Sequence, residues 1–117
     1  MKLTDKAKDD FEIFQIYRSL EITNRERPEN GKVSFETLVG YKHQIWNLDE
    51  VYLNALIIEW FDSVGLQITV ESIIGGDFRA DILENKFKTT HMDNRFESRL
   101  EATNAVIERT NEIYNER

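Results

Sequence analysis

The 117-residue chain contains no cysteine, one proline, five glycines and two histidines. Without cysteine it can form neither a disulfide scaffold nor a thiolate metal site, and it has no cysteine nucleophile. It also lacks the P-loop, GxGxxG, GxSxG and HExxH motifs. The longest apolar-rich run, residues 51–64, is too short to span a bilayer and is interrupted by two acidic residues. The first ten residues have no apolar signal segment, so we expect a cytoplasmic protein without membrane contact.

The few residues suited to catalysis are scattered. His43 and His91 are each isolated in the sequence, and a zinc site would need carboxylates to complete its ligands. Glu59 and Asp62 are spaced i, i+3 on one expected helix, an arrangement that an enzyme could use, although they can equally mark its solvent edge. Because paired nucleophiles and bases are missing, we expect no enzymatic activity, no cofactor and no metal.

The net charge of −7 is concentrated in the middle of the chain. Residues 45–84 contain eight acidic side chains and a single basic one, whereas the flanking thirds are balanced. Such a field attracts basic partners and repels nucleic acid, although acidity can also serve solubility alone. The residues that we predict to contact a protein partner are Asp49, Glu71, Asp77 and Asp81.

Hydrophobic periodicity predicts a helix at the N-terminus. The helix begins near Asp5 and ends near Ile22, with a core stripe at i, i+3, i+4 and i+7. This stripe comprises Ile13, Ile16, Tyr17 and Leu20, with Phe11 and Phe14 beside it. Residues 23–32 contain the proline and an Asn-Gly pair, which predicts a flexible loop. Residues 33–46 are ambiguous: Ser34 could cap a short helix that Gly40 ends or bends.

A central helix is predicted over residues 48–64. Asn47 and Glu50 have the spacing of a capping box, and Gly65 suits the left-handed position that ends a helix. Apolar residues occupy nearly every side of this segment, which is typical of a buried helix. The side chains that we expect in its core are Leu56, Ile57 and Phe61.

After Gly65 the apolar period changes from 3.6 to 2, which predicts a β-hairpin around Gly75-Gly76. A three-residue turn would pair Val70 with Ile82 and keep one face apolar. The same register places Glu71 opposite Asp81, where a divalent cation could relieve the repulsion between them. Arg79, on the same face and diagonal to Glu71, could partly neutralise it instead.

A second turn near residues 93–94 is expected to return a short strand through Phe96. Ser98 and Glu101 then form a capping box for a last helix. The apolar stripe of this helix comprises Ala102, Val106, Ile107, Thr110, Ile113 and Tyr114. The sequence therefore predicts one α+β domain over residues 1–117, in the order α-(α)-α-β-β-β-α, with a small antiparallel sheet packed against helices.

The order helix, three antiparallel strands, helix is also that of double-stranded-RNA-binding domains, which bind by shape and phosphate contacts. Basic residues cluster before and at the start of the last helix: Lys86, Lys88, Arg95 and Arg99. Acidic residues interrupt this cluster, and topology alone says little about function. A nucleic-acid-binding module is therefore the alternative hypothesis, ranked below protein binding.

Three stretches carry a resemblance: KLTDKAKDD, EWFDSVGL and FESRLEATNAVIERTNEIYNE. They resemble a group of short, uncharacterised proteins encoded in phage and prophage regions, over about a third of the chain. The resemblance implies a small intracellular accessory protein and supplies no reaction, ligand or site residue. Together with the acidic middle third, it favours a non-enzymatic protein that binds another protein. A basic, nucleic-acid-binding protein is the kind of partner that this acidity would attract.

Overall fold

The computed structural model describes residues 2–22 and 35–117. Its elements follow in the order α1 (Asp5–Ile22), α2 (Phe35–Trp46), α3 (Glu50–Ser63), β1 (Leu66–Ser72), β2 (Phe78–Glu84), β3 (Lys88–His91) and α4 (Arg99–Asn115). The predicted α+β fold and element order are confirmed. The ambiguous segment is one helix that continues through Gly40. The loop predicted at 23–32 and the cap predicted at Ser34 lie outside the described residues.

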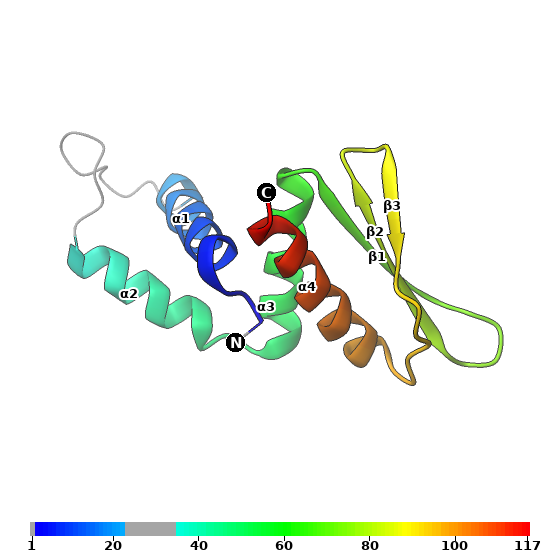
Figure 1. Cartoon of the computed structure of the whole chain (residues 1–117). Helices are drawn as coiled ribbons and strands as arrows, with labels where there is room; N and C mark the ends of the chain where they lie inside the picture. The colour runs from blue at the N-terminus through cyan, green and yellow to red at the C-terminus, as the bar shows by residue number, and fades with distance from the viewer. Residues whose placement is uncertain (1, 23–34) are drawn as a thin grey trace.

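The elements form layers (Figure 1). The antiparallel sheet, in the order β1-β2-β3, lies on one side of a central pair of helices, α3 and α4. Helix α1 packs against the other side of this pair, and α2 packs against α1. The sheet and α2 are therefore separated by the α3–α4 layer.

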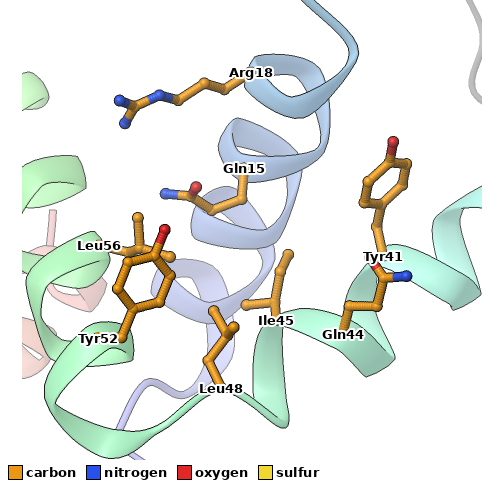
Figure 2. A pocket seen from close by; sticks show the side chains of 8 residues that line it. All are labelled: Gln15, Arg18, Tyr41, Gln44, Ile45, Leu48, Tyr52 and Leu56. Carbon is orange, nitrogen blue, oxygen red and sulfur yellow. The ribbon is translucent and has the colours of Figure 1, made fainter. Parts of the chain in front are cut away.

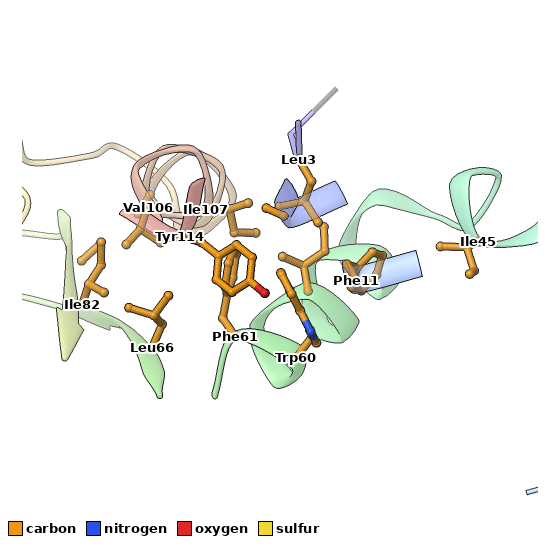
Figure 3. Close-up of a cluster of buried hydrophobic side chains, with 14 of the residues drawn as sticks. Leu3, Phe11, Ile45, Trp60, Phe61, Leu66, Ile82, Val106, Ile107 and Tyr114 are labelled. Atoms are coloured by element: carbon orange, nitrogen blue, oxygen red, sulfur yellow. The ribbon is translucent and has the colours of Figure 1, made fainter. Parts of the chain in front are cut away.

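Aromatic side chains form the centre of the core (Figure 3). Trp60 and Phe61 of α3 are buried, and their ring centroids lie 4.8 Å apart. The ring of Tyr114 in α4 stands edge-on to Trp60 at 4.9 Å, and that of Phe11 in α1 stands edge-on at 5.8 Å. Such tilted arrangements are favourable for aromatic rings. One cluster thus joins the three helices, and Leu66 extends it toward the sheet.

The predicted start of α4 is confirmed. Ser98 has extended backbone angles, and its Oγ accepts a hydrogen bond from the backbone N–H of Glu101 at 3.1 Å. That bond satisfies one of the amide groups that a helix start leaves unpaired.

We expect Ser98→Ala to lower the free energy of unfolding by about 1 kcal/mol, because the capping acceptor is lost. Ser98 is exposed, so no cavity adds to this cost. Urea unfolding would measure it, with the exposed strand residue Ser72, changed to alanine, as control. Equal unfolding midpoints for the Ser98 variant and the wild type would contradict this role.

The capping box predicted for α3 is wrong. The helix begins at Glu50 after Asp49, without a side-chain capping bond. Asn47 instead donates from Nδ2 to the carbonyl of His43 at 2.9 Å, which satisfies the end of α2. The Glu50 carboxylate accepts from Lys2 Nζ at 2.9 Å and from Asn104 Nδ2 at 3.0 Å. Both members of the predicted box are thus engaged in other contacts.

The stripe predicted for α1 is partly wrong: Ile16 is buried as expected, and the side chain of Leu20 lies outside the described ones. Ile13 and Tyr17 are about half exposed, whereas Ala7 and Phe11 are fully buried. Helix α4 fixes this orientation through asparagines that bind the start of α1. Asn111 Oδ1 accepts from the backbone N–H of Thr4 at 2.9 Å, and Asn115 Oδ1 accepts from the N–H of Ala7 at 2.8 Å. Both hydrogen bonds join residues more than a hundred positions apart in the sequence. Helical periodicity, which is a local pattern, does not reveal such contacts.

Tyr114 links the same two helices, since its hydroxyl donates to Asp10 Oδ2. Burial, followed by this hydrogen bond, raises the pKa of Tyr114 to about 12. In the unfolded chain the pKa is about 10, so the unfolded state loses this proton first. The stabilisation is therefore complete below about pH 10 and is lost as the pH rises toward 12.

We expect the free energy of unfolding to fall by up to about 2 kcal/mol between pH 10 and 12 because of this one group. Tyr114→Phe should remove that part of the pH dependence, whereas Tyr52→Phe, at an exposed position, should leave it. Urea unfolding at a series of alkaline pH values would measure both. An unchanged pH dependence in the Tyr114 variant would contradict the assignment.

The predicted apolar face of the hairpin is confirmed by the buried Ala80 and Ile82, but the predicted register is wrong by two residues. Val70 pairs with Ala80 and Glu71 pairs with Arg79. The turn occupies residues 74–76, because the backbone N–H of Ile73 already bonds to Asp77 O at 2.9 Å. Gly75 and Gly76 both have positive φ, so they fill the last two turn positions rather than the first two.

The third strand was predicted too late in the chain. A turn at residues 85–87, which was not predicted, leads into β3. The segment after β3 still reaches Phe96, which forms an antiparallel bridge with Phe78. The predicted return through Phe96 is thus an isolated bridge beyond the third strand.

Candidate protein-binding groove

The acidic residues predicted as a contact surface do not form one surface. Glu71 accepts two hydrogen bonds from the Arg79 guanidinium, at 3.0 and 2.8 Å, and this contact raises the pKa of Arg79. Asp81 Oδ1 lies 2.6 Å from Nδ1 of His91. Since Glu71 faces Arg79 and not Asp81, the predicted repulsion between the two carboxylates is wrong, and Arg79 neutralises Glu71, which was the alternative to a cation.

The remaining members of that set lie far apart in the fold. Asp77 is in the β1–β2 loop, whereas Asp49 precedes α3 at the end of α2. The acidic surface that was expected as one patch is therefore divided between the hairpin and the helical side of the molecule.

The basic residues of the alternative hypothesis are also separated. Lys86 and Lys88 lie at the β2–β3 turn, while Arg95 flanks Phe96, which bridges to the opposite end of β2. Arg99 donates to the carbonyl of Val70 at 3.0 Å, and its guanidinium lies 5.2 Å from the centre of the Phe78 ring. The basic residues therefore form two pairs, which lie at opposite ends of the sheet.

The residues considered for catalysis are not brought together. Glu59 forms an ion pair with Arg18 of α1, and Asp62 is exposed. His43 and His91 lie on different sides of the α3–α4 layer. Within residues 2–22 and 35–117, no three histidine or carboxylate side chains form a group that could hold a metal ion.

A surface hollow of about 290 Å³ lies between α1, α2 and α3 (Figure 2). We call it the helical groove. Its lining combines apolar side chains, two tyrosines and a few polar groups: Gln15, Arg18, Tyr41, Gln44, Ile45, Leu48, Tyr52 and Leu56. Residues from three helices therefore converge on a single concave surface.

The sharp connection between α2 and α3 creates this groove. The backbone N–H of Leu48 bonds to the carbonyl of Ile45 at 3.3 Å, which turns the chain at the end of α2. Ile45 and Leu48 therefore form one wall, and Tyr52 and Leu56 of α3 form the other. Tyr52 is 57% exposed and the neighbouring Val51 is 72% exposed. The start of α3 thus presents apolar surface to solvent.

A hydrogen-bonded ring of side chains holds this end of α3 in place. Lys2 Nζ donates to Glu50 and, at 2.6 Å, to Asn54 Oδ1. Asn54 Nδ2 donates to Asn104 Oδ1, and Asn104 Nδ2 donates to Glu50, both at 3.0 Å. The hydrogen bond from Lys2, followed by that from Asn104, lowers the pKa of Glu50. The wall of the groove is therefore built on a rigid helix start.

Gln15 is the unusual member of the lining. Its side chain extends from α1 into the hollow (Figure 2), and the residue is only 6% exposed. Its Nε2 has no hydrogen-bond partner in the described part of the chain. A buried donor without an acceptor costs about 1–3 kcal/mol, so an acceptor placed in the groove would relieve this cost.

Charged residues flank the apolar wall. Asp49, Tyr52, Leu56 and Glu59 follow one another at i, i+3, i+7 and i+10 along α3, so they lie on one face of the helix. Arg18 neutralises Glu59, whereas Asp49 is exposed and forms no ion pair within the described ranges. The free charge beside the wall is therefore negative.

The groove was not predicted, because apolar residues on nearly every side of α3 are typical of a buried helix. In the structure only Asn54, Ile57, Trp60 and Phe61 of α3 are buried. Leu56, which was expected in the core, is half-buried at the groove. One feature of the sequence does indicate the groove. The start of α3 contains more apolar residues than a core on one side of the helix can bury.

Among the described residues, no helix combines the length and apolar character needed to cross a membrane. Comparison with protein-family models, curated proteins and solved structures finds no match. The resemblance to phage and prophage proteins and the cytoplasmic location stay predictions.

Proposed function

We propose that the protein is a small non-enzymatic accessory protein that binds an apolar, basic segment of another protein in the helical groove. The strongest support is Gln15, a buried amide whose Nε2 has no hydrogen-bond partner among the described residues and which extends into the hollow. A bound peptide backbone supplies carbonyl oxygens, the acceptors that this amide lacks.

The lining supports a protein partner. Tyrosine and apolar side chains are typical of the centres of protein interfaces, where they contribute much of the binding energy. Tyr41 and Tyr52 stand on opposite sides of the groove, with Leu56 beside Tyr52. Asp49 at the edge favours basic side chains on the partner and disfavours a nucleic-acid backbone.

A short amphipathic peptide made of leucine and lysine is a suitable probe. Calorimetry should detect its binding to the wild type, and Tyr52→Asp should weaken that binding by about tenfold or more. Val51→Asp is the matched control, because Val51 is the more exposed neighbour and does not line the groove. Equal loss of affinity in the two variants would contradict the proposed site.

Two further measurements separate the alternatives. Gln15→Leu should fold at least as stably as the wild type but bind the peptide less tightly, since a useful donor has been removed. Duplex RNA should not bind measurably at physiological salt. Tight RNA binding that Lys86→Glu and Arg99→Glu abolish would support the nucleic-acid alternative instead.

A further inference from the structure

The β2–β3 turn has an unusual backbone. Asn85 and Lys86 both have positive φ, 49° and 68°, and the N–H of Phe87 bonds to Glu84 O at 3.0 Å. Two successive residues with positive φ resemble the centre of a type I′ turn, where glycine is strongly preferred. Because Glu84 pairs with Lys88, the loop here holds three residues, and Phe87 is the last of them. Lysine with positive φ stores backbone strain, which is common where a turn has a function.

The turn is also fixed to the rest of the protein. The N–H of Asn85 bonds to the carbonyl of Gly65, at the end of α3, with a distance of 2.8 Å. The approach is so close that a Cβ added to Gly65 would lie 2.3 Å from Asn85 Oδ1. The turn is therefore held in one position against the central helix.

This fixed turn exposes an aromatic side chain. Phe87 is 94% exposed, and Lys86 and Lys88 are its direct neighbours in the sequence. An aromatic ring presented by a rigid turn loses little conformational entropy on binding, which suits an interface anchor. The complementary surface would be an apolar hollow with negative charge at its edge.

The helical groove of the same protein has these properties, and we infer that Phe87 of one copy docks into the groove of a second copy. An apolar cavity of about 150 Å³ accommodates benzene, so the 290 Å³ of the groove has room for a phenyl ring. Lys86 and Lys88 then lie near Asp49 of the second copy. This inference rests on the proposed function, because it names one occupant of the proposed binding site.

Docking within one chain is excluded by the fold. The β2–β3 turn belongs to the sheet, and the groove lies across the α3–α4 layer from it. The contact therefore joins two different surfaces of two molecules, and such heterologous contacts form open chains or closed rings. An external partner of the groove would compete with this self-association.

Sedimentation of two variants, separately and mixed, tests the inference. The wild type should form dimers and larger species as its concentration rises. Phe87→Ser lacks the anchor and Tyr52→Asp lacks an intact groove, so each alone should be monomeric. Their equimolar mixture should form dimers and nothing larger, because each mixed pair retains one intact anchor and one intact groove.

Ile74→Ser is the matched control, because Ile74 is fully exposed at the other hairpin turn. It should assemble like the wild type. Monomeric wild type at every concentration, unchanged assembly of Phe87→Ser, or a monomeric mixture would each overturn the inference. Phe87→Ser should still bind the leucine–lysine peptide, so a failure of self-association is distinguishable from a failure of the proposed function.

Discussion

Phe61→Ala is expected to lower the free energy of unfolding by about 3–5 kcal/mol. Phe61 is fully buried, its ring lies 4.8 Å from Trp60, and Tyr114 lies 6.3 Å away on α4. Removing the ring leaves a cavity where α3 meets α4 beneath the sheet. Small domains have a total free energy of unfolding of about 5–15 kcal/mol. The substitution should therefore remove a large part of the protein's stability.

Val51→Ala on the same helix is the control. Val51 is largely exposed, so its truncation should change the unfolding free energy by less than about 0.5 kcal/mol. Chemical denaturation followed by tryptophan fluorescence would measure both variants. A cooperatively folded Phe61 variant with the wild-type midpoint would show that Phe61 is not in the core.

Gly65→Ala is expected to cost about 1–3 kcal/mol, because the residue has φ 86° and a side chain there is strained. The new Cβ would also lie 2.3 Å from Asn85 Oδ1. The side chain of Asn85 would have to move away, which weakens the contact between α3 and the β2–β3 turn.

Gly75→Ala separates the two causes. Gly75 has φ 106°, but a Cβ added there meets nothing within 4 Å. Its substitution should therefore show the backbone strain without the contact with Asn85. If Gly65→Ala costs no more than Gly75→Ala in urea unfolding, the close approach to Asn85 makes no contribution to stability.

The parts of the fold that local sequence determines were predictable. Ser98 and Glu101 have the capping-box spacing, and the structure contains that cap. Gly65 was expected in the left-handed region, and it has positive φ. In both places the residues that form the sequence pattern also form the predicted local structure. No distant side chain takes over their role.

The predictions were wrong where residues distant in the sequence bind the groups that a local pattern had assigned to a cap or a core face. Glu50 bonds to Lys2 and Asn104 instead of capping α3, and Asn111 and Asn115 determine which face of α1 is buried. The hairpin register differed by two residues, which leaves the same face apolar. Alternation of side chains therefore predicted the face correctly but could not distinguish these registers.

The candidate site was less predictable than the fold. Net charge identified the acidic segment, but the structure pairs Glu71 with Arg79 and Asp81 with His91. The groove depends on the angle between α2 and α3, which no local pattern specifies. The turn that exposes Phe87 was missed because Asn85-Lys86 lacks the glycine that normally marks a turn with positive φ.

Mapping of backbone amide shifts by NMR, during titration with the leucine–lysine peptide, tests most directly whether the helical groove binds protein segments. In most complexes of pre-organised proteins the backbone at the interface moves little on binding. The amide shifts should therefore report the contact surface. We expect the largest changes at Gln15, Ile45, Tyr52 and Leu56. Changes confined to the solvent-facing side of the sheet, around Glu71, Asp81 and His91, would contradict the account.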